Sequence, residues 1–187
     1  MLDANVIQPS TSEWSSAPVL VRKKDGSVRW CIDYRQLNQK TVKDSYPLPN
    51  IEDCLSTLSG SIYFSTLDME SGYYQVEIDP ADRKKTAFIT RFGLFEHVRM
   101  GFGLCNAPAT FQRVIRLVFR GLTWKDVVAY LDDVTCNILG LSFEEHLRNL
   151  DEVLERFQRY NLKLKPRNVS CFRQNASSWA RKSVEMG

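Results

Sequence analysis

The pair Asp132-Asp133 lies between two apolar runs, and this arrangement constrains the fold more than any other feature of the 187-residue chain. The runs 127–131 and 134–136 are rich in residues that favour strands. Adjacent side chains on a strand point to opposite faces, so a turn is needed to present both carboxylates together. The pattern therefore predicts a tight hairpin with the two aspartates at its tip.

Two readings of this hairpin tip stay open on the pair alone. Aspartate is common in solvated turns, which need no ligand. Alternatively, like charges held close together repel unless a cation lies between them, and Mg²⁺ prefers carboxylate oxygens. A third aspartate favours the metal site, because Asp68 follows the apolar run 62–67, which also predicts a strand.

The run 62–67 and the hairpin 127–136 are predicted to be neighbours in one sheet, with Asp68, Asp132 and Asp133 at one edge. Three carboxylates can hold two divalent ions about 4 Å apart, an arrangement that suits in-line phosphoryl transfer. Basic side chains nearby would make the substrate a nucleotide or a nucleic acid.

The composition is that of an ordinary globular protein, with 43% hydrophobic and 25% charged residues. The net charge of +3 is uneven: residues 61–110 carry 5 basic and 6 acidic side chains, whereas residues 111–187 carry 13 and 9. An acidic centre with basic flanks suits a metal site beside a polyanion, although an ordinary surface would have a similar balance. No run is long enough to span a membrane, and five widely spaced cysteines indicate reduced thiols in an intracellular setting.

The order of predicted elements indicates an α+β fold, with an antiparallel sheet and helices on one face. Hairpins are expected around Asp25-Gly26 and around Phe92-Gly93. The predicted helices span 50–58, 109–120 and 143–157, and an edge strand is expected at 162–166. The third helix begins with a capping box at Ser142, and its apolar stripe is interpreted as core. That stripe comprises Phe143, Leu147, Leu150, Val153, Leu154 and Phe157.

Several polar residues have structural interpretations. His97 and His146 show no metal-ligand spacing, and Asp33 with Arg35 is interpreted as an ion pair. Arg113 and Arg116 are assigned to a solvated or packing face. The basic hairpin at 19–32 fits a solvated edge strand and a phosphate-gripping finger equally well. Its basic residues are Arg22, Lys23, Lys24 and Arg29.

An ordered set of motifs carries a more specific signal. The motifs are Ser12-Glu13-Trp14-Ser15-Ser16, Arg22-Lys23-Lys24-Asp25-Gly26-Ser27, Cys31-Ile32-Asp33-Tyr34-Arg35-Gln36-Leu37-Asn38, Tyr46-Pro47-Leu48-Pro49, Phe64-Ser65-Thr66-Leu67-Asp68, Ser71-Gly72-Tyr73, Lys85-Thr86-Ala87-Phe88, the run Phe102-Gly103-Leu104-Cys105-Asn106-Ala107-Pro108-Ala109-Thr110-Phe111-Gln112, and Tyr130-Leu131-Asp132-Asp133. Over about residues 6–172, the chain resembles the reverse transcriptase of gypsy-type long-terminal-repeat retrotransposons, which is related to the retroviral enzymes.

The resemblance implies an RNA-directed DNA polymerase core. Asp68, Asp132 and Asp133 would coordinate two Mg²⁺ ions, with Mn²⁺ as the alternative. A primer 3′-hydroxyl would attack the α-phosphate of a dNTP on an RNA or DNA template. The remaining implied roles are triphosphate binding by Lys23 and Arg29, exclusion of a 2′-hydroxyl by Tyr73, a pocket border formed by Phe102 and Gly103, and nucleic-acid contacts by Lys24 and Tyr130.

The implied fold is the fingers and palm of a right-handed polymerase, without a thumb. Residues 1–60 with the basic hairpin and 81–106 would form the fingers. Residues 61–80, with the nucleotide-site segment, and 107–173, with the Asp-Asp hairpin, would form the palm, and 174–187 an atypical or disordered tail. The chain would be a fragment of a retrotransposon polyprotein that also carries thumb, connection and ribonuclease H domains. It would act in the cytoplasm or in a virus-like particle, with no membrane partner.

The chain departs from the family pattern at several positions. Gly101 replaces the usual proline, which should loosen its loop, and 135–137 interrupts an apolar strand. Near the family's proposed general-acid lysine the chain has Lys165, Arg167 and Asn168. The alternative function is therefore a catalytically dead nucleic-acid-binding relic. An RNA-dependent RNA polymerase is a third reading, which Tyr73 argues against.

Overall fold

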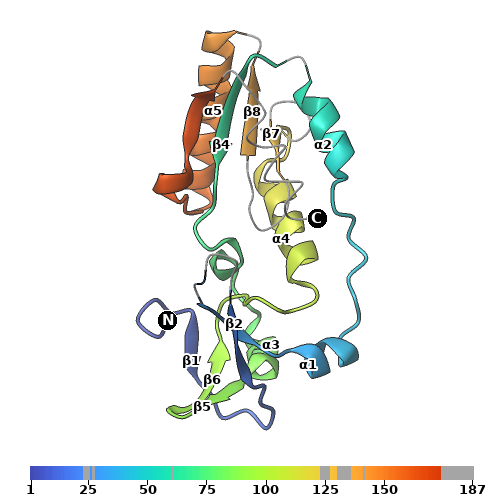
Figure 1. Ribbon diagram of the computed structural model, residues 1–187, viewed down its shortest axis with the longest axis vertical. Helices are drawn as coiled ribbons and strands as arrows, with labels where there is room; N and C mark the ends of the chain where they lie inside the picture. Colours follow the sequence, from blue (N-terminus) through green and yellow to red (C-terminus); the bar gives the residue numbers. More distant parts are fainter. Residues whose placement is uncertain are drawn as a thin grey trace. The chain divides into compact units, whose positions relative to one another are not determined.

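The computed structural model describes residues 1–22, 26, 28–59, 61–122, 127–129, 136–140 and 142–173. The chain forms two compact units, each built from two separate segments (Figure 1). Unit 1 consists of Met1–Ser45 and Tyr73–Pro108, and unit 2 of Tyr46–Gly72 and Ala109–Gly187. The division of the chain into fingers and palm segments stays a prediction, with its expected boundaries after residues 60, 80 and 106.

Unit 1 contains the two predicted hairpins, and both are confirmed. In the first, β2 pairs antiparallel with β3, and in the second β5 pairs with β6, whose other edge is taken by β1. The bounds are β1 (Ile7–Pro9), β2 (Pro18–Arg22), β3 (Val28–Ile32), β5 (Phe88–Thr90) and β6 (Gly93–His97). Short helices connect them: α1 (Arg35–Lys40), α3 (Pro80–Arg83), and the 3₁₀ turns η1 (Gly72–Gln75) and η2 (Lys84–Thr86).

The core of unit 1 forms around Ile32, Tyr34 and Phe88, which are at most 6% exposed. Partly buried side chains from several elements pack against these three: Ile7, Trp30, Leu37, Phe95 and Leu104. The predicted ion pair is confirmed on the surface, where Arg35 Nη2 lies 2.7 Å from Asp33 Oδ2. This pairing lowers the pKa of Asp33 to about 2, chiefly because Arg35 donates hydrogen bonds to the carboxylate.

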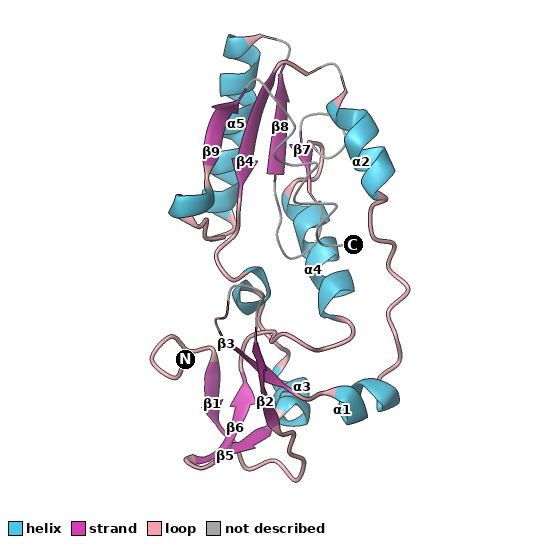
Figure 2. Cartoon of the chain, viewed as in Figure 1, coloured by secondary structure: helices cyan, strands magenta, loops and turns pink. Residues whose placement is uncertain are grey.

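Unit 2 contains a sheet in the order β7-β8-β4-β9 (Figure 2). The strands are β4 (Tyr63–Leu67), β7 (Val127–Val128), β8 (Cys136–Gly140) and β9 (Ser170–Arg173). The prediction that the run 62–67 and the hairpin 127–136 are sheet neighbours is confirmed, because β8 pairs with both β4 and β7. Leu67 pairs with Cys136, so the end of β4 lies beside the start of β8.

The predicted interruption of this strand at 135–137 is wrong for the residues that the structure describes. Cys136 and Asn137 belong to β8 and pair with Leu67 and Thr66. A strand flanked on both sides by partners tolerates residues of low strand propensity, because pairing and packing outweigh intrinsic preference.

The three predicted helices of unit 2 form close to their expected bounds, as α2 (Ile51–Leu58), α4 (Ala107–Val118) and α5 (Phe143–Arg159). Both predicted caps are present: Asn50 accepts a hydrogen bond from the Glu52 amide, and Ser142 accepts one from the Glu145 amide. Helix α5 packs along β4 and β8 (Figure 1). In the buried pair between Ser65 of β4 and His146 of α5, Oγ and Nε2 are 2.8 Å apart.

The stripe on α5 is only partly core, which corrects its interpretation. Leu150, Val153 and Phe157 are buried, and the ring of Phe157 meets that of Phe119 from α4 at 5.4 Å. The other members are between 39% and 42% exposed: Phe143, Leu147 and Leu154. The stripe is wider than the helix face that the described part of the chain covers.

The predicted edge strand at 162–166 is also wrong. Leu164 makes one isolated bridge with Met69, and a 3₁₀ turn, η3 (Pro166–Asn168), follows. Pro166 has no amide hydrogen to donate to a ladder, and the fourth strand forms further on, at β9. Within the described residues, no helix has the length and apolar character needed to cross a membrane.

Candidate functional site

Asp68 is the predicted site residue that the structure places most firmly. It directly follows β4 and is 6% exposed. Its Oδ2 accepts a hydrogen bond of 2.6 Å from Nδ2 of Asn168, and its carbonyl oxygen accepts one of 2.8 Å from the Lys165 amide. Glu70 donates its amide to the carbonyl of Lys163, at 3.0 Å. The segment around η3 thus fixes both the backbone and the side chain of Asp68.

The hydrogen bond from Asn168 leaves the charge of Asp68 in place. An amide donor is neutral, so it satisfies a lone pair of the carboxylate without compensating its negative charge. A buried carboxylate in this condition is costly unless a cation comes close. Of Lys165, Arg167 and Asn168, the residues near the family's proposed general-acid lysine, Asn168 is the one whose side chain donates a hydrogen bond to the Asp68 carboxylate.

The other two predicted carboxylates, Asp132 and Asp133, lie outside the described residues, as does Tyr130. The strands on either side of them, β7 and β8, are paired with each other. Among the described residues, no group of three or more carboxylate, histidine or cysteine side chains could hold a metal ion. Only Asp68 of the predicted set of three belongs to those residues.

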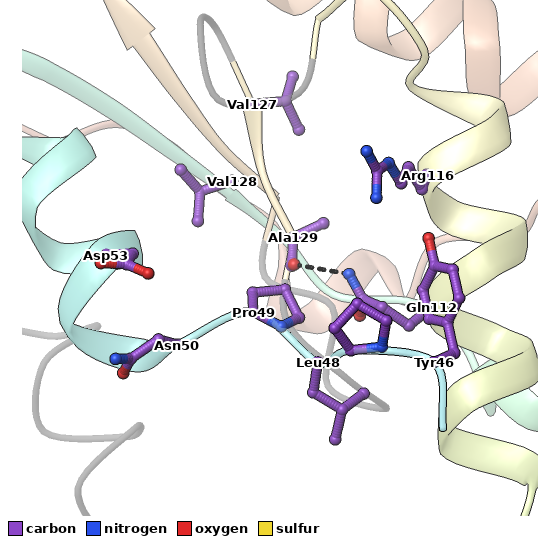
Figure 3. Close-up of a pocket in the computed structure, with 11 residues that line it drawn as sticks. Tyr46, Leu48, Pro49, Asn50, Asp53, Gln112, Arg116, Val127, Val128 and Ala129 are labelled. Carbon is purple, nitrogen blue, oxygen red and sulfur yellow. Dashed lines mark hydrogen bonds between the residues drawn. The ribbon is translucent and has the colours of Figure 1, made fainter. Parts of the chain in front are cut away.

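A cavity of about 280 Å³ in unit 2 lies beside the residues that lead into the Asp132-Asp133 segment (Figure 3). Gln112 of α4 donates a hydrogen bond of 3.2 Å to the carbonyl of Ala129, which anchors the chain after β7 (Figure 3). The residues that line the cavity are Tyr46, Pro47, Leu48, Pro49, Asn50, Asp53, Gln112, Arg116, Val127, Val128 and Ala129.

Arg113 and Arg116 lie on the exposed side of α4, as the interpretation of a solvated or packing face expects. The Arg113 guanidinium lies 4.7 Å from the centroid of the Tyr46 ring, a cation–π contact, and Arg116 borders the cavity. Both arginines therefore add positive charge to this side of unit 2.

The predicted nucleotide-pocket residues of unit 1 are brought together in part. Tyr73 is 7% exposed, and the centroid of its ring lies 5.2 Å from that of Phe102. Phe102 also meets the ring of Tyr74 edge-on at 5.5 Å. Two of the predicted residues, from segments about thirty positions apart, thus form one aromatic cluster.

Gly103 has a structural reason to be glycine. Its φ is +94°, and a Cβ atom there would lie 3.2 Å from the carbonyl oxygen of Ile32. Asn38, to which sequence reasoning gave no role, holds the same loop. Its Nδ2 donates to the Gly103 carbonyl at 2.7 Å, and its Oδ1 accepts from the Cys105 amide at 3.0 Å.

The predicted phosphate and nucleic-acid contacts of the basic hairpin are described only in part. Lys23 and Lys24 lie outside the described residues. The backbone of Arg29 pairs with Val21 within the hairpin, and its side chain is not among those described. The two readings of this hairpin therefore stay open.

Two buried histidines are held neutral by their surroundings. Burial lowers the pKa of His97 to about 4, and burial also lowers the pKa of His146. Neither lies among other metal-ligating side chains in the described residues. Both fit the predicted structural role, with His97 packed in unit 1 and His146 in unit 2.

Comparison with known proteins identifies the family of the chain. Residues 21–179 match the family model described as reverse transcriptase (RNA-dependent DNA polymerase). The chain belongs to this reverse transcriptase family.

Its relatives include polyproteins of retrovirus-like transposons. The chain is 36% identical over 193 residues to the retrovirus-related Pol polyprotein from transposon 412 and 42% identical over 169 residues to that from transposon 297, both of Drosophila melanogaster. These alignments cover 100% and 88% of this chain, but only 15% and 16% of the polyproteins. An RNA-directed DNA polymerase homolog of Oenothera berteroana is 43% identical, over 69% of this chain and 92% of that protein.

Solved structures confirm the fold. The foamy viral protease-reverse transcriptase in complex with dsDNA matches 92% of this chain and 35% of its own, with a TM-score of 0.83 and 22% identity. The same protein in complex with an RNA/DNA hybrid matches 91% of this chain with a TM-score of 0.82 and 20% identity. The predicted α+β fold, as part of a polymerase, is therefore confirmed.

Proposed function

We propose that the chain is the catalytic core of an RNA-directed DNA polymerase, which adds a dNTP to the 3′-hydroxyl of a primer on an RNA or DNA template. The observation that carries this proposal is the position of Asp68. It is buried and directly follows Leu67, which pairs with Cys136, the first residue of β8, the strand that follows Asp132 and Asp133 in the chain.

The chemistry of Asp68 fits a divalent cation. Its carboxylate offers hard oxygen atoms, and its described side-chain partner, Asn168, leaves the negative charge uncompensated. Asp68, Asp132 and Asp133 would together hold two Mg²⁺ ions, or Mn²⁺ in their place. When bound, two such ions activate the attacking hydroxyl and stabilise the leaving oxygen of an in-line displacement.

The other predicted residues would bind and orient the substrates. The Tyr73 ring, packed against Phe102, would lie under the deoxyribose and leave no room for a 2′-hydroxyl. The backbone at Gly103 would border the same pocket. Lys23 and Arg29 would place positive charge next to the triphosphate. Lys24 and Tyr130 would contact the nucleic acid.

The proposed partners follow from the same chemistry. A primer annealed to RNA or DNA and a dNTP are the substrates, and their phosphates would make binding depend on salt. The chain spans about 15% of the length of the transposon 412 polyprotein that it matches. We therefore assign thumb, connection and ribonuclease H functions to other parts of such a polyprotein, acting inside the cell, in the cytoplasm or in a virus-like particle.

Primer extension on an RNA template, at low salt and with Mg²⁺ or Mn²⁺, tests the proposal. The wild-type chain should extend the primer, Asp132→Asn should not, and Asp151→Asn should behave as wild type. Asp151 is a matched control because it is an exposed aspartate on α5. Extension by neither wild type nor control would overturn the proposed activity.

A second candidate, a non-catalytic nucleic-acid-binding relic, is favoured by one observation. Asn168 contacts Asp68 near the family's proposed general-acid lysine, and a side-chain amide cannot donate a proton to pyrophosphate as an ammonium can. Cys136 and Asn137 pair regularly with β4, so the sequence at 135–137 no longer supports a loss of catalytic function. Tight binding of an RNA–DNA duplex without metal-dependent incorporation would favour the relic.

A further inference from the structure

In unit 1, the side chain of His97 occupies the space beside the Cα atom of Gly101. His97 is 2% exposed, and the backbone of Gly101 is buried beneath its ring. A Cβ atom on residue 101 would lie 2.8 Å from Nε2 and 3.0 Å from Cδ2 of His97. The volume that a side chain at 101 would need is therefore filled by the imidazole, in a chain where glycine replaces the usual proline.

The His97 ring is fixed in orientation by a buried hydrogen-bond chain. The hydroxyl of Tyr34 donates to the Thr86 carbonyl at 2.8 Å, and its oxygen lies 3.0 Å from Nδ1 of His97. A hydroxyl has a single hydrogen, so Nδ1 of His97 must be the donor to Tyr34. This assigns the Nδ1–H tautomer and leaves Nε2 as the unprotonated atom that faces residue 101.

Aromatic contacts continue from His97 to the residues assigned to the nucleotide pocket. The ring of Tyr74 lies nearly parallel to His97, with an interplanar angle of 10° and centroids 6.4 Å apart. Tyr74 then meets Phe102 edge-on, and Phe102 contacts Tyr73. All of these residues belong to unit 1.

We propose that His97 is a positioning residue for the nucleotide pocket. It fills the space above Gly101 and, through Tyr74, sets where Phe102 and Tyr73 lie, and so how strongly the pocket rejects a ribose 2′-hydroxyl. This inference rests on the proposed function of Tyr73 and Phe102 as the border of the sugar site.

A double-mutant cycle tests the shared space without any need for activity. Gly101→Ala should lower the urea midpoint of unfolding in the wild-type background. The same change should have a much smaller effect in His97→Ala, because the clash with the ring is gone. If the two shifts simply add, the two residues do not share this space and the proposal is overturned.

Equilibrium binding of nucleotides tests the positioning role without chemistry. The chain is bound to a template and a dideoxy-terminated primer, and the Kd values for a matched dNTP and rNTP are measured. In wild type the dNTP should bind more tightly. We expect His97→Ala to reduce the Kd ratio about tenfold, and His97→Phe, which restores an aromatic ring, to recover most of it.

Phe95→Ala is the matched control for loss of stability. Phe95 is also on β6, but it reaches His97 only through Phe88: its ring lies 6.2 Å from that of Phe88, which lies 5.2 Å from that of His97. It should leave the Kd ratio within about twofold of wild type. An equal fall of the Kd ratio in Phe95→Ala and His97→Ala would show that His97 acts only through packing. Absence of nucleotide binding by the wild-type chain would also overturn the inference. A wild-type chain that discriminates in binding but never extends a primer would contradict the proposed catalysis and leave the role of His97 standing.

Discussion

The corner around Asp68 in unit 2 and the loop 101–106 in unit 1 are built on different physical principles. Asp68 is a buried charge held by one neutral amide and by backbone pairing. The loop contains no ionisable side chain except Cys105, and it is held by close packing against His97 and Ile32 and by the amide of Asn38.

Because of this difference, the two regions should contribute differently to activity and to stability. If Asp68 binds a cation as proposed, changes there should alter activity more than stability. In the loop, sterics and neutral hydrogen bonds fix the geometry, so changes there should alter stability and substrate fit together. Four predictions test this contrast.

The largest effect is expected from Asp68→Asn. Removing the carboxylate charge should lower the rate of nucleotide incorporation about 10³-fold or more, because a group that acts on transition-state charge is lost. The unfolding free energy should change little or rise, since a buried charge is relieved. Single-turnover incorporation and urea unfolding measure the two quantities. A variant that loses stability but keeps its incorporation rate would show that Asp68 supports the fold and does not act in the reaction.

The loop region should instead be sensitive to an added charge. The pKa of His97 is lowered from 6.5 to about 4, so the unfolded state binds a proton that the folded state rejects. Stability should therefore fall by about 3 kcal/mol as the pH drops from 6.5 toward 4. His97→Phe should remove most of this slope, and His146, whose pKa is shifted in the same direction, should supply the remainder. Identical slopes in the variant and wild type would show that His97 titrates normally.

A smaller effect is expected from Gly103→Ala. The positive φ and the close Ile32 carbonyl should together lower the unfolding free energy by about 2 kcal/mol. Gly121→Ala is the matched control, because Gly121 has a similar φ of +91° but nothing within 4 Å of its would-be Cβ. It should therefore show the backbone strain alone. Equal losses, measured by urea unfolding, would mean that the contact with Ile32 contributes nothing.

The smallest effect is expected from Asn168→Lys, which places an ammonium beside Asp68. A lysine can donate a proton to the leaving pyrophosphate, and we expect the incorporation rate at saturating Mg²⁺ to rise about tenfold. Asn168→Leu, which removes the donor and adds no charge, should slow the reaction. Rapid-quench measurement of one nucleotide addition compares the three chains. If Lys and Leu slow incorporation equally, the residue at 168 only orients Asp68.

Local chemistry made much of the fold predictable. The caps at Asn50 and Ser142 act within a few residues of themselves, and an Asp-Gly pair favours a hairpin, so these signals can be read from the sequence. The pairing of β4 with β8 followed from two apolar runs that each lead to or from aspartates.

Features that depend on distant partners were not predictable in this way. Strand β9 forms because β4 offers it an edge, and Phe172 is the one strong strand former among its four residues. Asn168 lies 100 positions from Asp68, and no local pattern links the two. Asn38 likewise reaches Gly103 across 65 positions. Each is a side-chain amide whose role exists only once the fold brings its partner close.

Anomalous diffraction from Mn²⁺ bound to the chain with primer, template and dNTP tests the central claim most directly. The account predicts manganese peaks within about 2.3 Å of carboxylate oxygens of Asp68, Asp132 and Asp133. Peaks elsewhere, or an Asp68 side chain separated from the other two by packed core, would contradict it.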